Sequence, residues 1–138
     1  MKTRLQNGKE QIFCEWRHKW VRLTPEEWVR QQLLHRMVET LGYPASLIAV
    51  EAVIRVGDIQ KRCDAVVYNN AMQPLMLIEC KAETVALTQK TLDQAVIYNR
   101  TLQVPYILLY NGLQTICVNG KDISTSGIPR YADLLRRE

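Results

Sequence analysis

Two charged side chains at the end of an apolar stretch, Glu79 and Lys81, are the residues of this chain best suited to chemistry. They close the segment PLMLIECKA (residues 74–82), most of whose other members are apolar. In an extended strand, residues two apart point to the same face, so the carboxylate and the ammonium would lie side by side. Charged groups are costly to bury in a core. The pair therefore predicts a site where a core strand reaches the edge of a sheet.

A second acid, Asp64, is predicted to join this pair. If Tyr68 pairs with Leu75 across a hairpin, antiparallel counting places Asp64 directly opposite Glu79. Two carboxylates at this separation repel each other unless a cation compensates them. Asp and Glu side chains together with a backbone carbonyl suit Mg²⁺, and Lys81 could orient a water or offset charge on a phosphate. This set predicts metal-dependent hydrolysis of a phosphodiester.

The same residues also allow a purely structural interpretation. Glu-x-Lys occurs in many strands by chance, so the motif alone is weakly specific. Asp64 would then cap the end of a strand, while Glu79 and Lys81 would form a surface ion pair with Arg62. Exposed ion pairs of this kind contribute little to stability.

The segment after the Glu79 strand adds two polar positions. Residues 88–102 show helical spacing of apolar residues, and within them Gln94 and Tyr98 are four apart and share a helical face. A helix that crosses over directly after this strand can present that face to the strand's end. Taken alone, such a polar and aromatic pair is typical of the edge of a core.

The elements that must position these residues mix helices with strands. Thr24 as N-cap and Pro25 as first helical residue mark a strong helix start, and Gly42 followed by Pro44 ends the helix. Asn111-Gly112 predicts a tight hairpin. The further elements are predicted as strands within residues 47–57, 62–68, 74–81, 104–110 and 113–120 and helices over residues 88–102 and 130–138. A strand, a helix and a strand in succession form a unit with parallel strands, so the fold class is α/β with a mixed sheet.

The 138 residues are the length of one domain. We expect basic N-terminal strands over residues 1–23, a core over residues 24–118 and a tail over residues 119–138. No apolar run approaches the roughly 18 residues that cross a bilayer, and the polar N-terminus lacks a signal-peptide core, so no membrane association is expected. Four cysteines without a CxxC pair predict packed thiols in a cytoplasmic protein.

The net charge of +4 is concentrated near the N-terminus. Residues 1–36 hold eight Lys and Arg against four acids, whereas residues 37–138 hold ten against ten. Basic residues interleaved with Trp16 and Trp20 could grip a phosphate backbone and stack on bases. An edge strand whose two Trp side chains pack inward explains the pattern equally well. Charge alone does not identify a nucleic-acid-binding protein.

The order Asp … Glu-x-Lys … Gln-x-x-x-Tyr resembles the PD-(D/E)XK nuclease superfamily. More closely, it is similar to the N-terminal nuclease domain of type I restriction enzyme R subunits. The resemblance extends over LTPEEWVRQ, KRCDAVVY, PLMLIECKA, LDQAVIYNR and YILLYNG. It implies a restriction-endonuclease-like αβββαβ core with a mixed sheet flanked by helices. Cys63 departs from the family, which usually has proline before the aspartate, but proline binds no metal.

The resemblance also implies roles for the site residues. Mg²⁺, for which Mn²⁺ can substitute, would be bound by Asp64, Glu79 and the backbone carbonyl of Cys80. Lys81 would serve the attacking water. The two helix residues, Gln94 and Tyr98, would place the DNA backbone or the catalytic lysine.

Two upstream acids have open assignments. Glu27 lies where the superfamily often has a metal-assisting acid in its first helix, but its place three after Thr24 is explained by a capping box, which we favour. Glu51, in the first core strand, could reach the site or pair with Lys61 or Arg55.

The function implied by the resemblance is that of a Mg²⁺-dependent DNA endonuclease-like domain. The sequence contains no Walker A loop, helicase motor or target-recognition region, so a separate motor or specificity subunit joins DNA among the expected partners. A homodimer would double the basic N-terminal surface. The alternative is a non-catalytic nucleic-acid-binding module that retains the nuclease fold.

Overall fold

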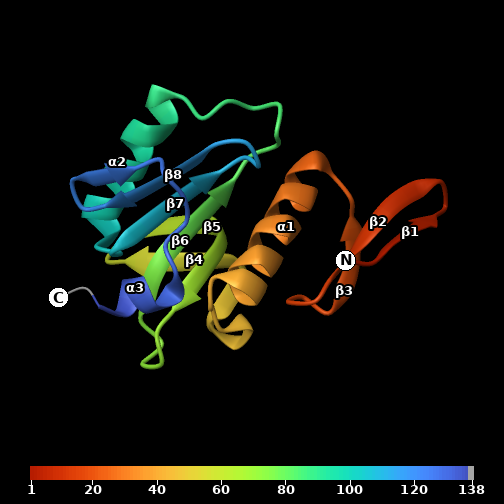
Figure 1. Cartoon of the computed structure of the whole chain (residues 1–138), viewed down its shortest axis with the longest axis horizontal. Coiled ribbons are helices and arrows are strands. Elements are labelled where there is room, and N and C mark those ends of the chain that lie inside the picture. The colour runs from red at the N-terminus through yellow and green to blue at the C-terminus, as the bar shows by residue number, and fades with distance from the viewer. Residues whose placement is uncertain (137–138) are drawn as a thin grey trace.

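The computed structural model describes residues 1–136 as a small three-stranded sheet followed by a larger six-stranded sheet with helices on both faces (Figure 1). In chain order the elements are β1 (Thr3–Gln6), β2 (Lys9–Cys14), β3 (Lys19–Arg22), α1 (Pro25–Thr40), a short 3-10 helix (Ala45–Leu47), β4 (Ile48–Val56), β5 (Ile59–Tyr68), β6 (Pro74–Cys80), α2 (Gln89–Leu102), β7 (Tyr106–Tyr110), β8 (Thr115–Asn119), β9 (Asp122–Ser124) and α3 (Tyr131–Leu135). The predicted C-terminal helix extended over Arg137 and Glu138, which lie outside the described residues.

The large sheet has the strand order β4-β5-β6-β7-β8-β9. Strands β6 and β7 are parallel, with α2 as the crossover between them, and the other neighbouring pairs are antiparallel. The sheet is therefore mixed, and α1-β4-β5-β6-α2-β7 is the predicted αβββαβ core. Strand β9 was not predicted and lies in the segment that we expected to be a tail.

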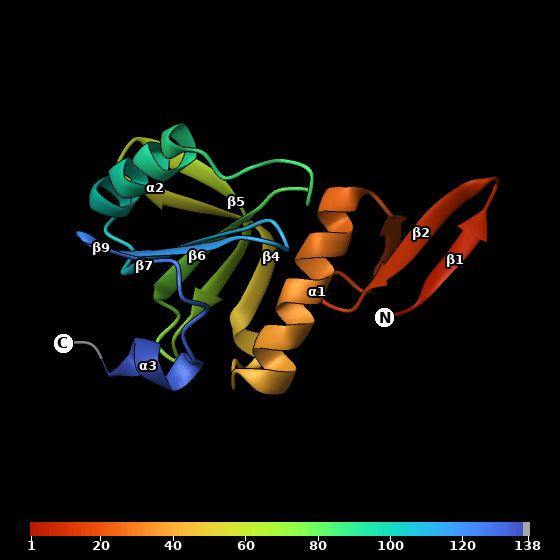
Figure 2. The ribbon, with the colours of Figure 1, turned by 45° about the horizontal axis from the view of Figure 1, so that its top comes forward.

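Helices cover both faces of this sheet. Figure 2 shows α2 on one face and α1 with α3 on the other. Each face has its own cluster of buried side chains: Leu33 and Met37 of α1 pack with Ile78 and Leu108, while Ala95 of α2 packs with Leu77 on the opposite face. Strands β6 and β7 are thus buried on both sides, which explains their nearly continuous apolar sequences.

Local signals account for the start and end of α1. The Thr24 hydroxyl accepts a hydrogen bond from the Glu27 backbone N–H at 3.0 Å, and Pro25 occupies the first turn. At the other end, Gly42 has φ +78°, which lets the Tyr43 N–H bond back to the Met37 carbonyl at 3.1 Å. The helix therefore begins and ends where the sequence predicts.

The hairpin between β4 and β5 changes face part of the way along its length. Val50 and Ala65, which are paired, pack on the α1 side, whereas the next pair along, Ala52 and Cys63, packs on the α2 side. A regular strand keeps residues two apart on one face. This alternation is interrupted between the pairs Val50–Ala65 and Ala52–Cys63. There Glu51 has φ +54°, a value uncommon for a residue other than glycine. Asp64, opposite Glu51, therefore lies at the point where the hairpin changes face.

Two predicted turns differ in detail from the structure. Tyr68 pairs with Pro74 rather than with Leu75, because the register shifts after Val67. The loop at Asn111 is a four-residue connection between the paired residues Tyr110 and Thr115, longer than a two-residue hairpin turn. The side chain of Asn111 explains the conformation, since its Oδ1 accepts hydrogen bonds from the backbone N–H groups of Leu113 and Gln114 in the same loop.

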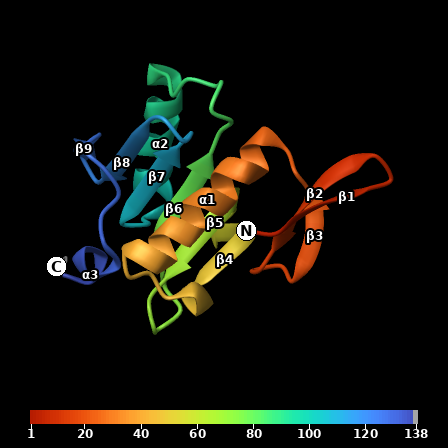
Figure 3. The same cartoon turned by 45° about the vertical axis from the view of Figure 1, so that its right-hand side comes forward.

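We call strands β1–β3 the N-terminal arm. Figure 3 shows α1 between the arm and the large sheet. Ile12 and Cys14 of β2 are fully buried and attach the arm to the rest of the molecule. Trp16 packs inward, with its indole N–H donating to the Ala45 carbonyl at 3.2 Å, whereas Trp20 lies under the Arg4 guanidinium. The two Trp residues therefore belong to different environments.

Two sequence-based expectations concern the whole chain. The four cysteines are free and buried, as predicted. Within residues 1–136, no helix combines the length and the apolar composition needed to cross a membrane.

Candidate functional site

Asp64 lies just beyond the last paired residues of β5 and β6, Ala65 and Ile78. Its Oδ2 accepts a hydrogen bond from the backbone N–H of Cys80 at 2.7 Å, and its Oδ1 is 3.4 Å from Arg30 Nη1. Burial raises the pKa of Asp64, although the Cys80 N–H and the Arg30 charge act in the opposite direction. The carboxylate therefore joins the end of β6 to α1.

Glu79 has a different partner on the other face. Its Oε1 is 2.6 Å from Lys61 Nζ, which also lies 4.8 Å from the centroid of the Tyr98 ring. Burial alone would lower the pKa of Lys61, but the hydrogen bond and charge of Glu79 outweigh burial and raise it. A small pocket between the sheet and α2 is lined by Lys61, Glu79, Gln94 and Tyr98. The structure therefore brings Glu79 together with the two helix residues, as their spacing predicts.

Lys81 directly follows β6 and continues its pairing with β7 through a hydrogen bond from its backbone N–H to the Tyr110 carbonyl at 2.9 Å. Its side chain is half-buried. Among residues 1–136 its ammonium makes no hydrogen bond or ion pair, although its charge acts on Asp64 in the direction that favours the carboxylate. Within the described residues, Lys81 is thus a cation without a fixed partner near Asp64.

Asp64 and Glu79 are near enough for the Glu79 charge to add to burial in raising the pKa of Asp64, but they do not point to one face as the regular register predicts. The register between Ala65 and Val67 is the predicted one. However, Asp64 contacts Arg30 of α1, whereas Glu79 contacts Lys61 in the pocket under α2. Continuous alternation along β5 was assumed, and the face change of the β4–β5 hairpin breaks it at Asp64 itself.

Glu27 is the centre of a buried ion cluster. Its carboxylate accepts hydrogen bonds from Arg17 Nη2 at 2.7 Å and Gln31 Nε2 at 2.8 Å, and a third from Arg30 Nη2. Burial by itself would raise the pKa of Glu27, but these hydrogen bonds outweigh it and lower the pKa. Half of the favoured capping box is present, because Thr24 accepts from the Glu27 N–H. The predicted return bond, from the Thr24 backbone N–H to the Glu27 carboxylate, is wrong, because the carboxylate binds Arg17 and Arg30 instead.

Glu51 belongs to the same cluster. It binds Arg17 Nη1, lies 3.6 Å from Arg30 Nη2 and 3.1 Å from Arg62 Nη2. Of the two alternatives left open for Glu51, the contacts favour the first, since Arg30 connects it to Asp64 at the candidate site. Neither Lys61 nor Arg55 is its partner, and Arg62 pairs with Glu51 and not with Glu79 and Lys81. The face change explains the difference, since the positive φ at Glu51 removes this residue from the regular alternation of β4.

Three cations of the site were missed: Arg17, Arg30 and Lys61. Arg30 carried a local signal, because it is three residues after Glu27 on one helix face. The contacts of Arg17 with Glu27 and Glu51 span 10 and 34 residues. Nothing in the local spacing around Arg17 or Lys61 indicates such partners.

The donor chemistry of Asp64 and Glu79 fits a hard divalent cation. Two carboxylates and the carbonyl of Cys80, between them in the chain, are oxygen ligands of the kind that Mg²⁺ prefers. Each carboxylate is bound to a protein cation, Arg30 or Lys61, which a metal would replace at least in part. In the described part of the chain no three His, Cys, Asp or Glu side chains form a group that could hold a metal ion, so the backbone oxygen would be needed.

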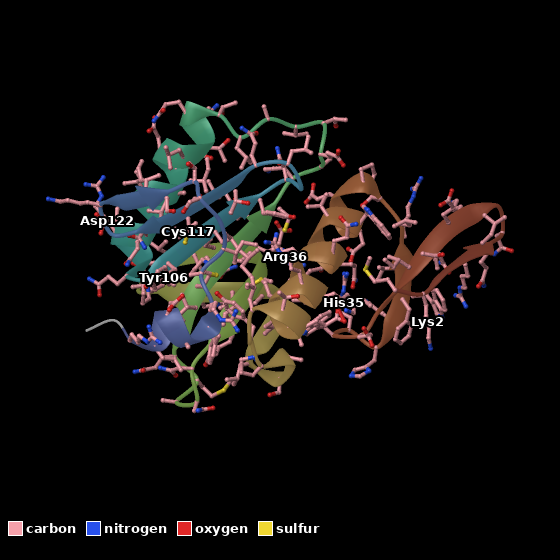
Figure 4. The ribbon with its side chains drawn as sticks, viewed as in Figure 1. Lys2, His35, Arg36, Tyr106, Cys117 and Asp122 are labelled. Carbon is pink, nitrogen blue, oxygen red and sulfur yellow. The ribbon has the colours of Figure 1, made fainter. Side chains whose placement is uncertain are left out.

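A pocket of about 410 Å³ lies elsewhere, beside β8 and β9. Figure 4 labels three of its lining residues, Tyr106, Cys117 and Asp122. Burial raises the pKa of the Cys117 thiol to about 11, so the thiol is protonated at neutral pH. A protonated thiol is a poor nucleophile, and the acids of the candidate site are not among the residues that line this pocket.

Comparisons with known proteins agree with this fold. The chain superposes with a TM-score of 0.61 and 17% identity on a fragment of a candidate HsdR subunit of a type I restriction enzyme from Vibrio vulnificus YJ016, over 83% of this chain and 25% of that one. A candidate nuclease belonging to DUF820 from Anabaena variabilis ATCC 29413 superposes with a TM-score of 0.54 and 9% identity, over 93% and 86% of the two chains. At these identities the likeness shows a shared fold.

The match to this chain spans only about a quarter, 25%, of the HsdR fragment chain. Among curated proteins, none matches the sequence. The family described as the type I restriction enzyme R protein N terminus (HSDR_N) matches residues 25–131, from the start of α1 to the start of α3. Since this match includes β5, β6 and α2, which carry the candidate site, the chain belongs to the type I restriction enzyme R protein N-terminus family.

Proposed function

We propose that this chain is a Mg²⁺-dependent DNA endonuclease-like domain that hydrolyses phosphodiesters. The observation that supports this function most is the arrangement at the end of β6. There Glu79 and the unpartnered Lys81 flank Cys80, whose N–H binds the Asp64 carboxylate at 2.7 Å. Acids beside a free cation are the groups needed to hold a metal and to offset charge on a phosphate.

The residues have distinct proposed roles. Asp64, Glu79 and the Cys80 carbonyl would hold Mg²⁺, for which Mn²⁺ can substitute. When bound, the metal would act as a Lewis acid toward the phosphodiester. Lys81 would orient the attacking water and balance developing charge. Gln94 and Tyr98, which lie in the Glu79 pocket, would position the DNA backbone or the lysine.

The acids of the first elements have supporting roles in this proposal. Glu27 and Glu51 hold Arg17 and Arg30, and Arg30 in turn reaches Asp64. We therefore propose that both acids position Asp64 through the arginines and do not bind the metal themselves.

The relatives support the choice of substrate and partners. One solved relative is described as a fragment of a type I restriction enzyme subunit and another as a candidate nuclease. By analogy, DNA is the proposed substrate, and a separate motor or specificity subunit is a proposed partner. Four free buried thiols accord with a reducing cytoplasm as the proposed location.

A second function is favoured by a specific observation. Asp64 and Glu79 are both neutralised by protein cations, Asp64 by Arg30 of α1 and Glu79 by Lys61 of β5. A domain that binds nucleic acid without cutting it would have no need to release these ion pairs. The alternative is therefore a non-catalytic DNA-binding module with the nuclease fold.

Plasmid nicking with Mg²⁺ or Mn²⁺ separates the two functions. We expect the wild type to nick DNA and Lys81→Ala to lose at least about 100-fold in rate, the scale of lost electrostatic or proton-transfer catalysis. Lys90→Ala is the matched control, because Lys90 is an exposed lysine of α2. Equal nicking by Lys81→Ala and the wild type would contradict the mechanism. DNA binding without nicking would favour the module.

A further inference from the structure

The outward face of the N-terminal arm combines basic and aromatic side chains. The pairing of β1, β2 and β3 puts Arg4, Gln11 and Arg22 in one row across the three strands. Ile12, the neighbour of Gln11, is fully buried, and Cys14 on the same face of β2 interacts with Gln31 of α1, so by alternation this row points away from α1. Arg4 and Arg22 are exposed.

The same face carries two aromatic rings and a further lysine. Phe13 pairs with Trp20, and their rings meet edge to face with centroids 5.5 Å apart. Lys9, at the tip of the hairpin, pairs with Gln6 and shares the face with Arg4. Within strands β1–β3, every residue of which is described, this face has no carboxylate. Glu10, the acid of these strands, pairs with Leu5 on the opposite face.

The Arg4 guanidinium is held in a fixed orientation. Its Cζ lies 4.3 Å from the centroid of the Trp20 ring, and its Nε donates a hydrogen bond to Gln11 Oε1 at 2.7 Å. Among the described residues, the two Nη groups make no hydrogen bond or ion pair. A planar fork that is already oriented and has two free donors suits bidentate binding of a phosphate.

The arm itself is fixed to the candidate site. Arg17, in the turn between β2 and β3, binds both Glu27 and Glu51, and the same cluster reaches Asp64 through Arg30. Cys14 adds a contact to Arg17 Nε at 3.2 Å. A ligand held by the arm would therefore sit in a defined place relative to Asp64.

We propose that the outward face of the N-terminal arm binds the phosphate backbone of DNA and holds it for the site at the end of β6. The arm precedes residues 25–131, so the family match assigns it no role. The inference rests on the proposed function only for the choice of DNA as the ligand. The basic groups recognise the charge of the backbone and not the bases, so binding is independent of sequence.

The test measures the binding of a short labelled DNA duplex by fluorescence anisotropy in EDTA, which prevents cleavage, over a range of salt concentrations. The probe variant is Arg4→Gln/Arg22→Gln. The matched control is Lys19→Gln/Lys121→Gln, which removes the same charge: Lys19 pairs with Cys14 on the inner face of β3, and Lys121 is exposed in the β8–β9 turn. Thermal unfolding of both variants checks that the fold is retained.

We expect the probe variant to bind at least about tenfold more weakly, and the slope of log K against log salt to fall by about 1.8, since each phosphate contact contributes about 0.9. The control should change the affinity less than about threefold. Trp20→Leu, which keeps every charge but removes the ring under Arg4, should show an intermediate loss. Equal affinities for probe and control variants, or no binding by the wild type at low salt, would overturn the inference.

A separate nicking assay distinguishes this inference from the proposed function. If the wild type binds through the arm but never cuts, the nuclease function fails and the inference stands. If the wild type cuts and the arm variant binds and cuts equally well, the inference alone fails. A Lys9→Gln variant supplies the same comparison if the double variant does not fold.

Discussion

Asp64 and Glu79 lie on neighbouring strands, yet their surroundings differ sharply. On the α1 side, Asp64 joins a cluster of three acids in which Arg17 and Arg30 each bind more than one carboxylate. On the α2 side, Glu79 has one cation among the described residues, Lys61, as its partner. A cluster in which each group has several partners resists rearrangement, whereas a single ion pair is easily exchanged. From this difference we expect the α1 side to fix the geometry of the site and the Lys61–Glu79 pair to open more readily.

The largest effect is expected from Glu27→Gln. The substitution leaves two arginines without their main carboxylate partner in a place where the Glu27 side chain is only 6% exposed. Removing one partner of a buried ion cluster costs about 3 kcal/mol of unfolding free energy, measured by urea denaturation. Glu26→Gln, at the exposed neighbouring position, should change stability by less than about 0.5 kcal/mol. Similar losses in both variants would show that the cluster is not a stabilising centre.

The next effect is a pair of pH dependences with opposite signs. The folded-state pKa of Glu27 is lowered, so its stabilisation is present above the usual pKa of glutamate and is lost as the pH falls through the folded-state value. The folded-state pKa of Asp64 is raised, so its contribution is present at low pH and lost as the pH rises through that value. The deficit of Glu27→Gln relative to wild type should therefore shrink in acid. By contrast, Asp64→Asn should gain stability relative to wild type from acid to neutral pH.

Urea titrations of the three proteins between acidic and neutral pH would measure both trends. Parallel pH profiles for the two variants would contradict the opposite environments of the two acids.

A smaller effect is expected from Lys61→Met. The variant frees Glu79 of its single partner while keeping the length of the apolar stem. An ion pair of this partly exposed kind contributes about 1 kcal/mol, so Mn²⁺ should bind about fivefold more tightly if metal and lysine compete for Glu79. Calorimetric titration measures the change. Lys90→Met, on the exposed side of α2, is the control and should leave the affinity unaltered. Weaker Mn²⁺ binding in Lys61→Met would show that Lys61 supports the metal site and does not compete with it.

The smallest effect is expected from Tyr98→Phe. The ring that lies beside Lys61 is retained, and only the hydroxyl is lost. We expect the free energy of unfolding to change by less than about 0.5 kcal/mol, whereas Tyr98→Ala should destabilise more because it removes the ring. If Tyr98 positions DNA through its hydroxyl, nicking by Tyr98→Phe should fall although the stability does not.

Much of the fold was predictable because its signals are local. Thr24 and Pro25 predict the start of α1, and the spacing of apolar residues after Thr88 predicts α2. Thr88 itself is the N-cap of α2. The register from Ala65 to Val67 and the grouping of Glu79 with Gln94 and Tyr98 followed from counting along regular elements.

The unpredicted parts depend on long-range contacts. No local signal shows that Glu51 adopts a positive φ or that β4 and β5 change face there, and so Asp64 was placed on the wrong side. The pairings of Arg17 with Glu27 and of Lys61 with Glu79 join separate elements that come together only in the folded chain. Hydrophobic periodicity carries no information about such charge pairs.

The most direct test of the proposed metal site is calorimetric titration of Mn²⁺ into the wild type, Asp64→Asn, Glu79→Gln and, as a control, the exposed Glu83→Gln just beyond β6. We predict that the wild type and the control bind one Mn²⁺ with equal affinity and that both site variants lose detectable binding. Retained binding in Asp64→Asn and Glu79→Gln, or no binding in the wild type, would contradict a metal site at the end of β6 and favour the DNA-binding module.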